Sequence, residues 1–158
     1  MSTQSKVESL IHESNLKGNT VFENIGEVPN FPFEDFSNLV KGIKSRQASL
    51  RRHSLLIEAT IFYAVANRNE KLFYVVGQIL LWGAIPFGLT LGILVSWWLL
   101  IVATLVYLFG KKIVSDTYDK SIFRSAMGSE RIFCFLYHHS QICVGLTLDK
   151  SIHYYKGT

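Results

Sequence analysis

Hydrophobic positions along the 158-residue chain gather in one continuous stretch, from Leu72 to Gly110, that contains no charged residue. A helix needs about 20 apolar residues to cross a bilayer core that is roughly 30 Å thick. One straight helix over the whole stretch would reach about 58 Å, which is too far for a single crossing. The pattern therefore predicts a membrane protein in which the stretch folds back once, as a two-helix transmembrane hairpin.

The residues that disfavour a helix lie near the middle of this stretch. Pro86 removes a helical hydrogen-bond donor and clashes with the preceding turn, and two glycines follow it closely. We therefore expect a turn near Pro86–Gly92, which connects helices over Leu72–Gly88 and Leu91–Gly110.

A stripe of small residues at every fourth position supports a different interpretation. Small side chains at this spacing form a groove in which the backbone of another helix can approach closely. The stripe favours one continuous helix over Phe87–Gly110, in which case Leu72–Ile85 is an interfacial or re-entrant segment. The candidate helix-packing residues of this stripe are Ala84, Gly88, Gly92 and Ser96.

Basic residues flank the apolar stretch on both sides. Arg68 and Lys71 precede it, and Lys111 and Lys112 follow it. Because basic residues near membrane ends stay on the cytoplasmic side, we expect both termini in the cytoplasm and the turn in the opposite compartment. Basic residues on both sides of the stretch favour the hairpin over a single span. The expected location of the protein is a bacterial inner membrane.

The chain before the hairpin divides into two expected segments. Residues 1–33 form a polar N-terminal arm with a short helix over Ser5–Leu16, and this arm is expected either to dock as a loop or to be loosely ordered. Residues 34–71 begin with apolar side chains at helical spacing from Phe36 to Leu50. A second apolar piece, Leu55–Ala66, is too short to span and predicts a buried or juxtamembrane helix with Glu58 exposed.

No acidic residue occurs between Phe36 and Ile57, although several basic residues do. A basic amphipathic helix of this kind is typical of segments that lie on an anionic membrane leaflet. The same periodicity also fits a solvated basic face on a helix that packs against its own protein. With the residues that flank the hairpin, the candidate membrane-surface set is Lys41, Lys44, Arg46, Arg51, Arg52, Arg68, Lys71, Lys111 and Lys112.

Residues 111–158 carry first a helical and then a strand pattern. The second membrane helix is expected to continue through Lys111–Asp119, followed by a helical pattern over Ile122–His139 that Gly128 interrupts. Two short β-type runs around residues 149–151 then predict a β-hairpin. An isolated β-hairpin is marginal in water, so it should pack on the preceding helix or pair with a neighbouring chain. The expected fold is a mainly α integral membrane protein with cytoplasmic helices and a small C-terminal β-hairpin.

Charge and composition narrow the expected partners. The formal net charge is +4, with nine basic and eight acidic residues before the apolar stretch and seven and four after it. The basic excess is therefore modest and local, which favours anionic lipid headgroups over nucleic acid as the partner.

The only cluster with ligand-like side chains consists of Cys134, His138, His139 and Cys143. Its spacing matches no standard zinc finger, and cysteines in apolar surroundings are equally explained as small buried hydrophobic residues. No nucleophile–histidine pair, phosphate-binding glycine loop or paired-acid motif is present. We therefore expect no catalytic site, no metal site and no cofactor.

These features predict a small non-catalytic subunit of a larger membrane assembly, of the secretion, transport or scaffold type. The small-residue stripe, the β-hairpin and the N-terminal arm would supply contacts to other membrane subunits or to further copies of the chain. The alternative is an oligomeric pore-forming or membrane-permeabilising effector controlled by its cytoplasmic parts. A two-helix hairpin with short cytoplasmic parts is similar to the arrangement in small subunits of secretion machines and in two-helix effectors of bacterial defence systems. No motif in the sequence selects either class.

Overall fold

The computed structural model describes residues 3–16, 21–53 and 58–155, and these divide into two compact units. One unit joins Met1–Val65 with Ile122–Thr158, and the other is Ala66–Ser121. The first unit thus brings together parts of three segments that the sequence analysis treats separately.

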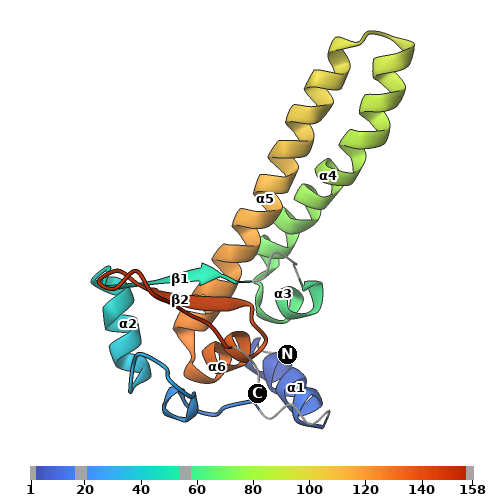
Figure 1. Ribbon diagram of the computed structural model, residues 1–158. Helices are drawn as coiled ribbons and strands as arrows, with labels where there is room; N and C mark the ends of the chain where they lie inside the picture. The colour runs from blue at the N-terminus through green and yellow to red at the C-terminus, as the bar shows by residue number, and fades with distance from the viewer. Residues whose placement is uncertain (1–2, 17–20, 54–57, 156–158) are drawn as a thin grey trace. The chain divides into compact units, whose positions relative to one another are not determined.

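The Ala66–Ser121 unit is a hairpin of two long helices, seen in green and orange in Figure 1. Helix α4 spans Arg68–Leu94 with 27 residues, and α5 spans Trp98–Gly128 with 31 residues and continues beyond this unit. Both are long and apolar enough to cross a membrane. Asn67 begins α4 in a capping box, in which its backbone N–H donates to Glu70 Oε2 at 2.8 Å.

The predicted hairpin is present, but the predicted position of its turn is wrong. Pro86 lies inside α4, and the chain reverses at residues 95–97. The helix continues through the proline since the local loss of one hydrogen bond is tolerated in apolar helices, and the Thr90 hydroxyl donates to the Pro86 carbonyl at 2.8 Å. The alternative of one long helix over Phe87–Gly110 is also wrong, because α4 ends at Leu94.

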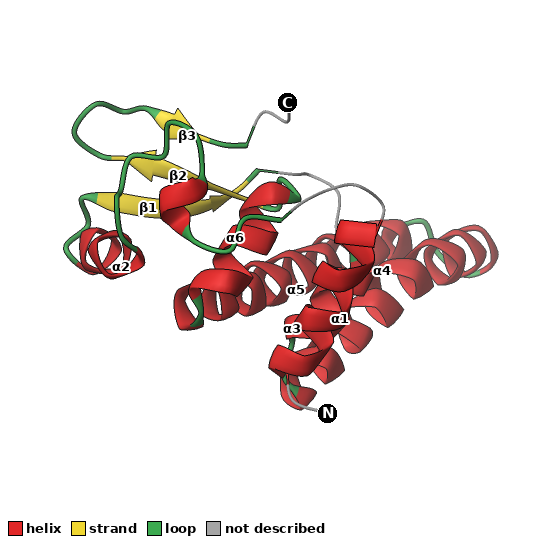
Figure 2. Cartoon of the chain, turned by 90° about the horizontal axis from the view of Figure 1, so that it is seen from below, coloured by secondary structure: helices red, strands yellow, loops and turns green. Residues whose placement is uncertain are grey.

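The other unit combines short helices with a small sheet (Figure 2). Its predicted first helix is confirmed, and so is the interruption at Gly128. Ser129 follows with extended backbone angles at the N-cap position, immediately before α6. Residues 54–57, part of the predicted Leu55–Ala66 helix, lie outside the described residues. The elements are α1 (Thr3–Leu16), η1 (Ile25–Glu27), α2 (Phe36–Lys44), β1 (Ala48–Arg52), α3 (Ala59–Val65), α6 (Glu130–His138), β2 (Ile142–Leu146) and β3 (Ile152–His153).

The sheet is antiparallel with the order β1-β2-β3. The predicted C-terminal β-hairpin is confirmed as β2 and β3. The predicted helix over Phe36–Leu50 is only half correct, because α2 ends at Lys44 and β1 follows. Arg46, between them, has a left-handed φ of 61°, which stops the helix. The strand then pairs with β2, so that Ala48 lies opposite Leu146 and Arg52 lies opposite Ile142.

This unit has a hydrophobic core of its own, and the N-terminal arm packs on it. The ring of Phe31 lies 5.7 Å from that of Phe133 and 5.3 Å from that of Tyr137. The backbone N–H of Ile25 donates to Glu130 Oε1 at 2.9 Å. The arm therefore docks on its own chain. Large core side chains with almost no exposed surface are Ile25, Leu39, Phe62, Phe133, Leu136 and Ile142.

Candidate helix-packing site and basic surface

Three of the four small residues singled out in the sequence lie between α4 and α5. Ala84, Gly88 and Gly92 are buried. A Cβ atom added to Gly88 would overlap the Cβ of Ala103, and one added to Gly92 would lie 2.6 Å from the side chain of Leu100. The stripe is therefore occupied by the second helix of the same hairpin.

Two glycines that the sequence analysis missed lie where the backbones of the two helices face each other directly. A Cβ on Gly110 would lie 2.9 Å from the backbone nitrogen of Leu81 and 3.0 Å from the carbonyl oxygen of Gly77. Gly77 precedes Ala84 by seven residues, which places it on the same helical face, and this spacing was the available signal. Ser96, the fourth residue of the stripe, lies in the turn after α4.

The outer surface of the hairpin remains apolar and uncovered. Trp82, Phe87 and Ile93 are 68%, 70% and 80% exposed. Within the most apolar 18-residue window of each helix, only 22% of α4 and 11% of α5 is buried. A core helix of a soluble domain would be mostly buried instead, so this surface is available to lipid or to another protein.

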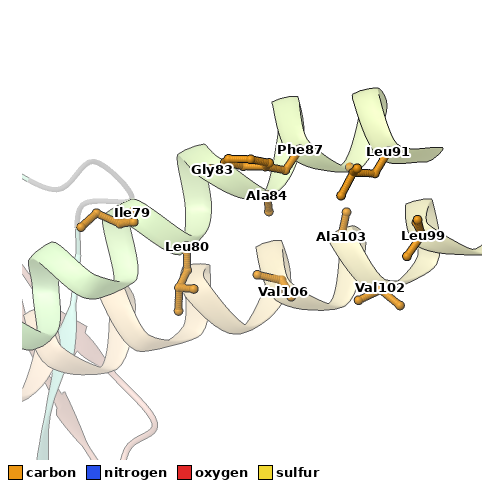
Figure 3. A pocket seen from close by; sticks show the side chains of 11 residues that line it. Ile79, Leu80, Gly83, Ala84, Phe87, Leu91, Leu99, Val102, Ala103 and Val106 are labelled. Atoms are coloured by element: carbon orange, nitrogen blue, oxygen red, sulfur yellow. The ribbon is translucent and has the colours of Figure 1, made fainter. Parts of the chain in front are cut away.

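Two apolar grooves follow the hairpin on either side of the contact between Gly88 and Ala103. The first, here called the Phe87 groove, has a volume of about 350 Å³ and is lined by apolar residues of both helices, among them Gly83, Phe87, Leu91 and Leu99 (Figure 3). The second, about 310 Å³, is lined by Ile85, Leu89 and Tyr107, among others. Both grooves lack charged side chains.

The four basic residues that flank the apolar stretch lie at one end of the hairpin. Because Gly77 packs against Gly110, the start of α4 lies beside the part of α5 that follows Gly110. This arrangement places these residues away from the turn at 95–97, and the hairpin therefore has an apolar shaft and one basic end. The four residues are Arg68, Lys71, Lys111 and Lys112.

The other five basic candidates do not share one helical face. Lys41 and Lys44 lie in the last turn of α2, Arg46 lies in the turn after it, and Arg51 and Arg52 belong to β1. Neighbouring strand residues point to opposite faces of a sheet, so Arg51 and Arg52 are separated. The prediction of a single basic amphipathic helix is therefore wrong. Most of these basic side chains are nevertheless exposed.

The two cysteines are buried thiols. Burial raises the pKa of Cys134 to about 12, and the carboxylates of Glu130 and Glu27 act in the same direction. Burial also raises the pKa of Cys143, and Arg51 partly opposes this effect. Both thiols are therefore protonated at neutral pH, whereas metal ligation and nucleophilic attack need the thiolate.

The two histidines of the same cluster contact residues from both the N-terminal and the C-terminal parts of the chain. His139 Nε2 lies 3.3 Å from the hydroxyl of Ser14, and the ring of His138 packs against those of Phe22 and Tyr155. Burial lowers the pKa of both histidines. Within the described ranges, no group of three or more histidine, cysteine or acidic side chains is placed to hold a metal ion.

Comparisons with protein-family models, with curated proteins and with solved structures find no match to this chain.

Proposed function

We propose that the chain is a small non-catalytic integral membrane subunit that packs within a larger membrane assembly of the secretion, transport or scaffold type. The observation that carries this proposal is the exposed apolar hairpin, with a groove of about 350 Å³ along Phe87. The hairpin would span the bilayer with its basic end in the cytoplasm.

Length and charge support insertion of the hairpin into a membrane. Helices of 27 and 31 residues reach about 40 and 46 Å, which exceeds a hydrocarbon core of roughly 30 Å. Apolar side chains cover the shaft, and the basic residues lie at one end only. Basic residues at a membrane boundary are retained in the cytoplasm.

The Phe87 groove supports packing against a further membrane helix. Gly83 lines this groove, and the nearest side-chain atom to a Cβ added there would be Phe87 Cδ2 at 3.9 Å, so the space beside it is open. A small residue in an apolar groove lets the backbone of another helix approach closely. We infer that a membrane helix of another subunit occupies the groove.

The polar side chains of the apolar stretch favour a packing role over a water-filled pore. The hydroxyls of Thr90 and Thr104 donate to carbonyls of their own helices at 2.8 Å, and Gln78 accepts a hydrogen bond from the indole of Trp82 at 2.9 Å. A conducting pore needs a polar lining that these residues do not provide.

Site-specific photocrosslinking in native membranes tests the proposal. A photoreactive phenylalanine analogue at Phe87, which lines the groove, should capture a membrane protein in an adduct of defined mass. The same analogue at Ile93, which is exposed but outside both grooves, is the matched control and should react with lipid.

A groove-filling variant separates a specific partner from random contacts. A Cβ atom at Gly83 meets no atom of α5 within 4 Å, so Gly83→Leu should extend into the open groove and keep the hairpin folded while the Phe87 adduct is lost. A monodisperse monomer in mild detergent, together with equal lipid adducts at Phe87 and Ile93, would contradict the proposed role.

A further inference from the structure

The central strand of the small sheet has a residue without a side chain in the middle of one face. Gly145 of β2 pairs with Ser49 of β1 on one side and with Ile152 of β3 on the other. Paired residues point to the same face of a sheet, so the missing side chain leaves a hollow between Ser49 and Ile152. Its volume is about 420 Å³. Glycine inside a strand weakens it and often marks a bulge, a bend, or a place where a ligand or another backbone approaches closely.

Two cationic residues, Arg51 and Lys150, line this hollow. A Cβ atom added to Gly145 would lie 3.2 Å from the Ser49 hydroxyl oxygen and 3.6 Å from Arg51 Nε. The hydroxyl, which donates to the Gly145 carbonyl at 3.5 Å, and the guanidinium therefore both lie beside the glycine, and Lys150 lines the same hollow. None of the lining residues is acidic, and among the described residues neither Arg51 nor Lys150 is paired with a carboxylate.

The loop that carries Lys150 is held in place by backbone hydrogen bonds. The N–H of Leu146 donates to the Ser151 carbonyl at 2.9 Å, and the N–H of Thr147 donates to the Gln47 carbonyl at 2.8 Å. The Thr147 hydroxyl also donates to the Arg46 carbonyl at 2.8 Å. Because the loop is tied both to itself and to the start of β1, the cation is presented to the hollow by an ordered backbone, which reduces the entropy cost of binding.

We propose that this hollow is an anion site that binds a phosphate monoester. A guanidinium presents a planar fork of donors that matches two phosphate oxygens, and the lysine ammonium supplies further donors. The volume is in the range of small-molecule sites, so the hollow accepts an esterified group beside the phosphate. The ester is either a soluble small molecule or the headgroup of a phosphatidic acid. This site is independent of the Phe87 groove and of the role proposed for it.

Titration of the full-length protein in a nonionic detergent tests the site. Glycerol phosphate and inorganic phosphate are added at constant ionic strength, with chloride as the reference salt, and the Arg51 Nε–H and Gly145 amide resonances are followed by NMR. We expect saturable shifts with glycerol phosphate. Loss of a charged hydrogen-bond partner in Arg51→Gln or Lys150→Gln should weaken binding by about tenfold or more.

Two further variants make the test specific to the hollow. Gly145→Ala keeps all charges but places a methyl group where the phosphate would lie, so it should also weaken binding, while the amide spectrum reports that the sheet is intact. Lys44→Gln, in α2, removes the same charge as Lys150→Gln outside the hollow. It should leave the affinity unchanged within about twofold.

Vesicles distinguish the two sources of the ester. If phosphatidylcholine vesicles that contain phosphatidic acid protect the Arg51 resonance and free glycerol phosphate does not, the ligand is the lipid headgroup. Binding of glycerol phosphate in the absence of lipid identifies a soluble ester. Absence of binding in both arms, or equal losses in Lys44→Gln and Lys150→Gln, would overturn the proposal.

Discussion

Gly77 and Gly110 lie at positions of the hairpin where even one added Cβ atom would not fit. At these positions the backbones of α4 and α5 approach within a distance that leaves no space for a side chain. Without water to drive burial, helices in a membrane depend on such close packing. A side chain at either position would therefore force the two helices or their neighbouring side chains to shift.

We predict that Gly110→Leu destabilises the hairpin by roughly 1–3 kcal/mol, the range for overpacked sites. Its Cβ would lie 2.9 Å from a backbone nitrogen, which cannot move as a side chain can. Unfolding titrations in mixed micelles measure the change. Gly83→Leu is the matched control and should stay within about 0.5 kcal/mol of the wild type. Equal losses in both variants would refute the close contact.

The second residue-scale prediction concerns Cys134. Because burial raises its pKa to about 12, the thiolate fraction is very small at neutral pH and grows about tenfold per pH unit until that value. We expect alkylation of native protein to be slow at pH 7 and to accelerate up to about pH 12. A cysteine placed at Leu148, which is 85% exposed, is the control and should react rapidly. Rapid modification of Cys134 in folded protein would contradict its burial.

At the scale of elements, α4 illustrates a competition between local and tertiary effects. Pro86 disfavours a helix locally, but α4 continues through it for two further turns and packs Gly88 and Gly92 on α5. Packing along the whole helix therefore outweighs one missing hydrogen bond.

We predict that Pro86→Ala keeps the hairpin and increases its free energy of unfolding by up to about 3 kcal/mol, since alanine restores the missing donor. Unfolding in mixed micelles and helix content by circular dichroism provide the measurement. If Pro86 formed the turn, the substitution would instead extend one helix and disrupt the hairpin, which a decrease in stability would reveal.

At the scale of the whole molecule, the two units differ in the burial of their apolar side chains. The unit with the sheet buries its aromatic and aliphatic residues in a core, whereas the hairpin exposes most of its own. This contrast is expected if the solvent differs, with water around one unit and lipid around the other.

Cysteine labelling in intact cells tests the resulting topology. In chains with Cys134 and Cys143 replaced, single cysteines are placed at Ser96 in the turn and at the exposed residues Glu34 and Asp149 of the other unit. If the basic end lies in the cytoplasm as proposed, an impermeant reagent should label only the Ser96 site. The other two sites should react only after permeabilisation. Labelling of Glu34 or Asp149 in intact cells would reverse or remove the proposed orientation.

The sequence alone determined the features that depend on local composition. An uncharged apolar stretch from Leu72 to Gly110 is too long for one crossing, so the helical hairpin follows from length. The break at Gly128 and the β-hairpin after it follow equally from residue types and their spacing. The basic end follows from the charges on each side of the stretch.

Only the tertiary structure decided what depends on distant partners. The turn lies at residues 95–97 because packing of Gly88 and Gly92 on α5 keeps the chain helical past Pro86. Residues 48–52 form a strand because β2, more than ninety residues later, supplies the hydrogen bonds. The hollow at Gly145 exists for the same reason, since Ser49 and Arg51 reach it only through that pairing. Strand pairing and helix contact are non-local, and no window of sequence contains both partners.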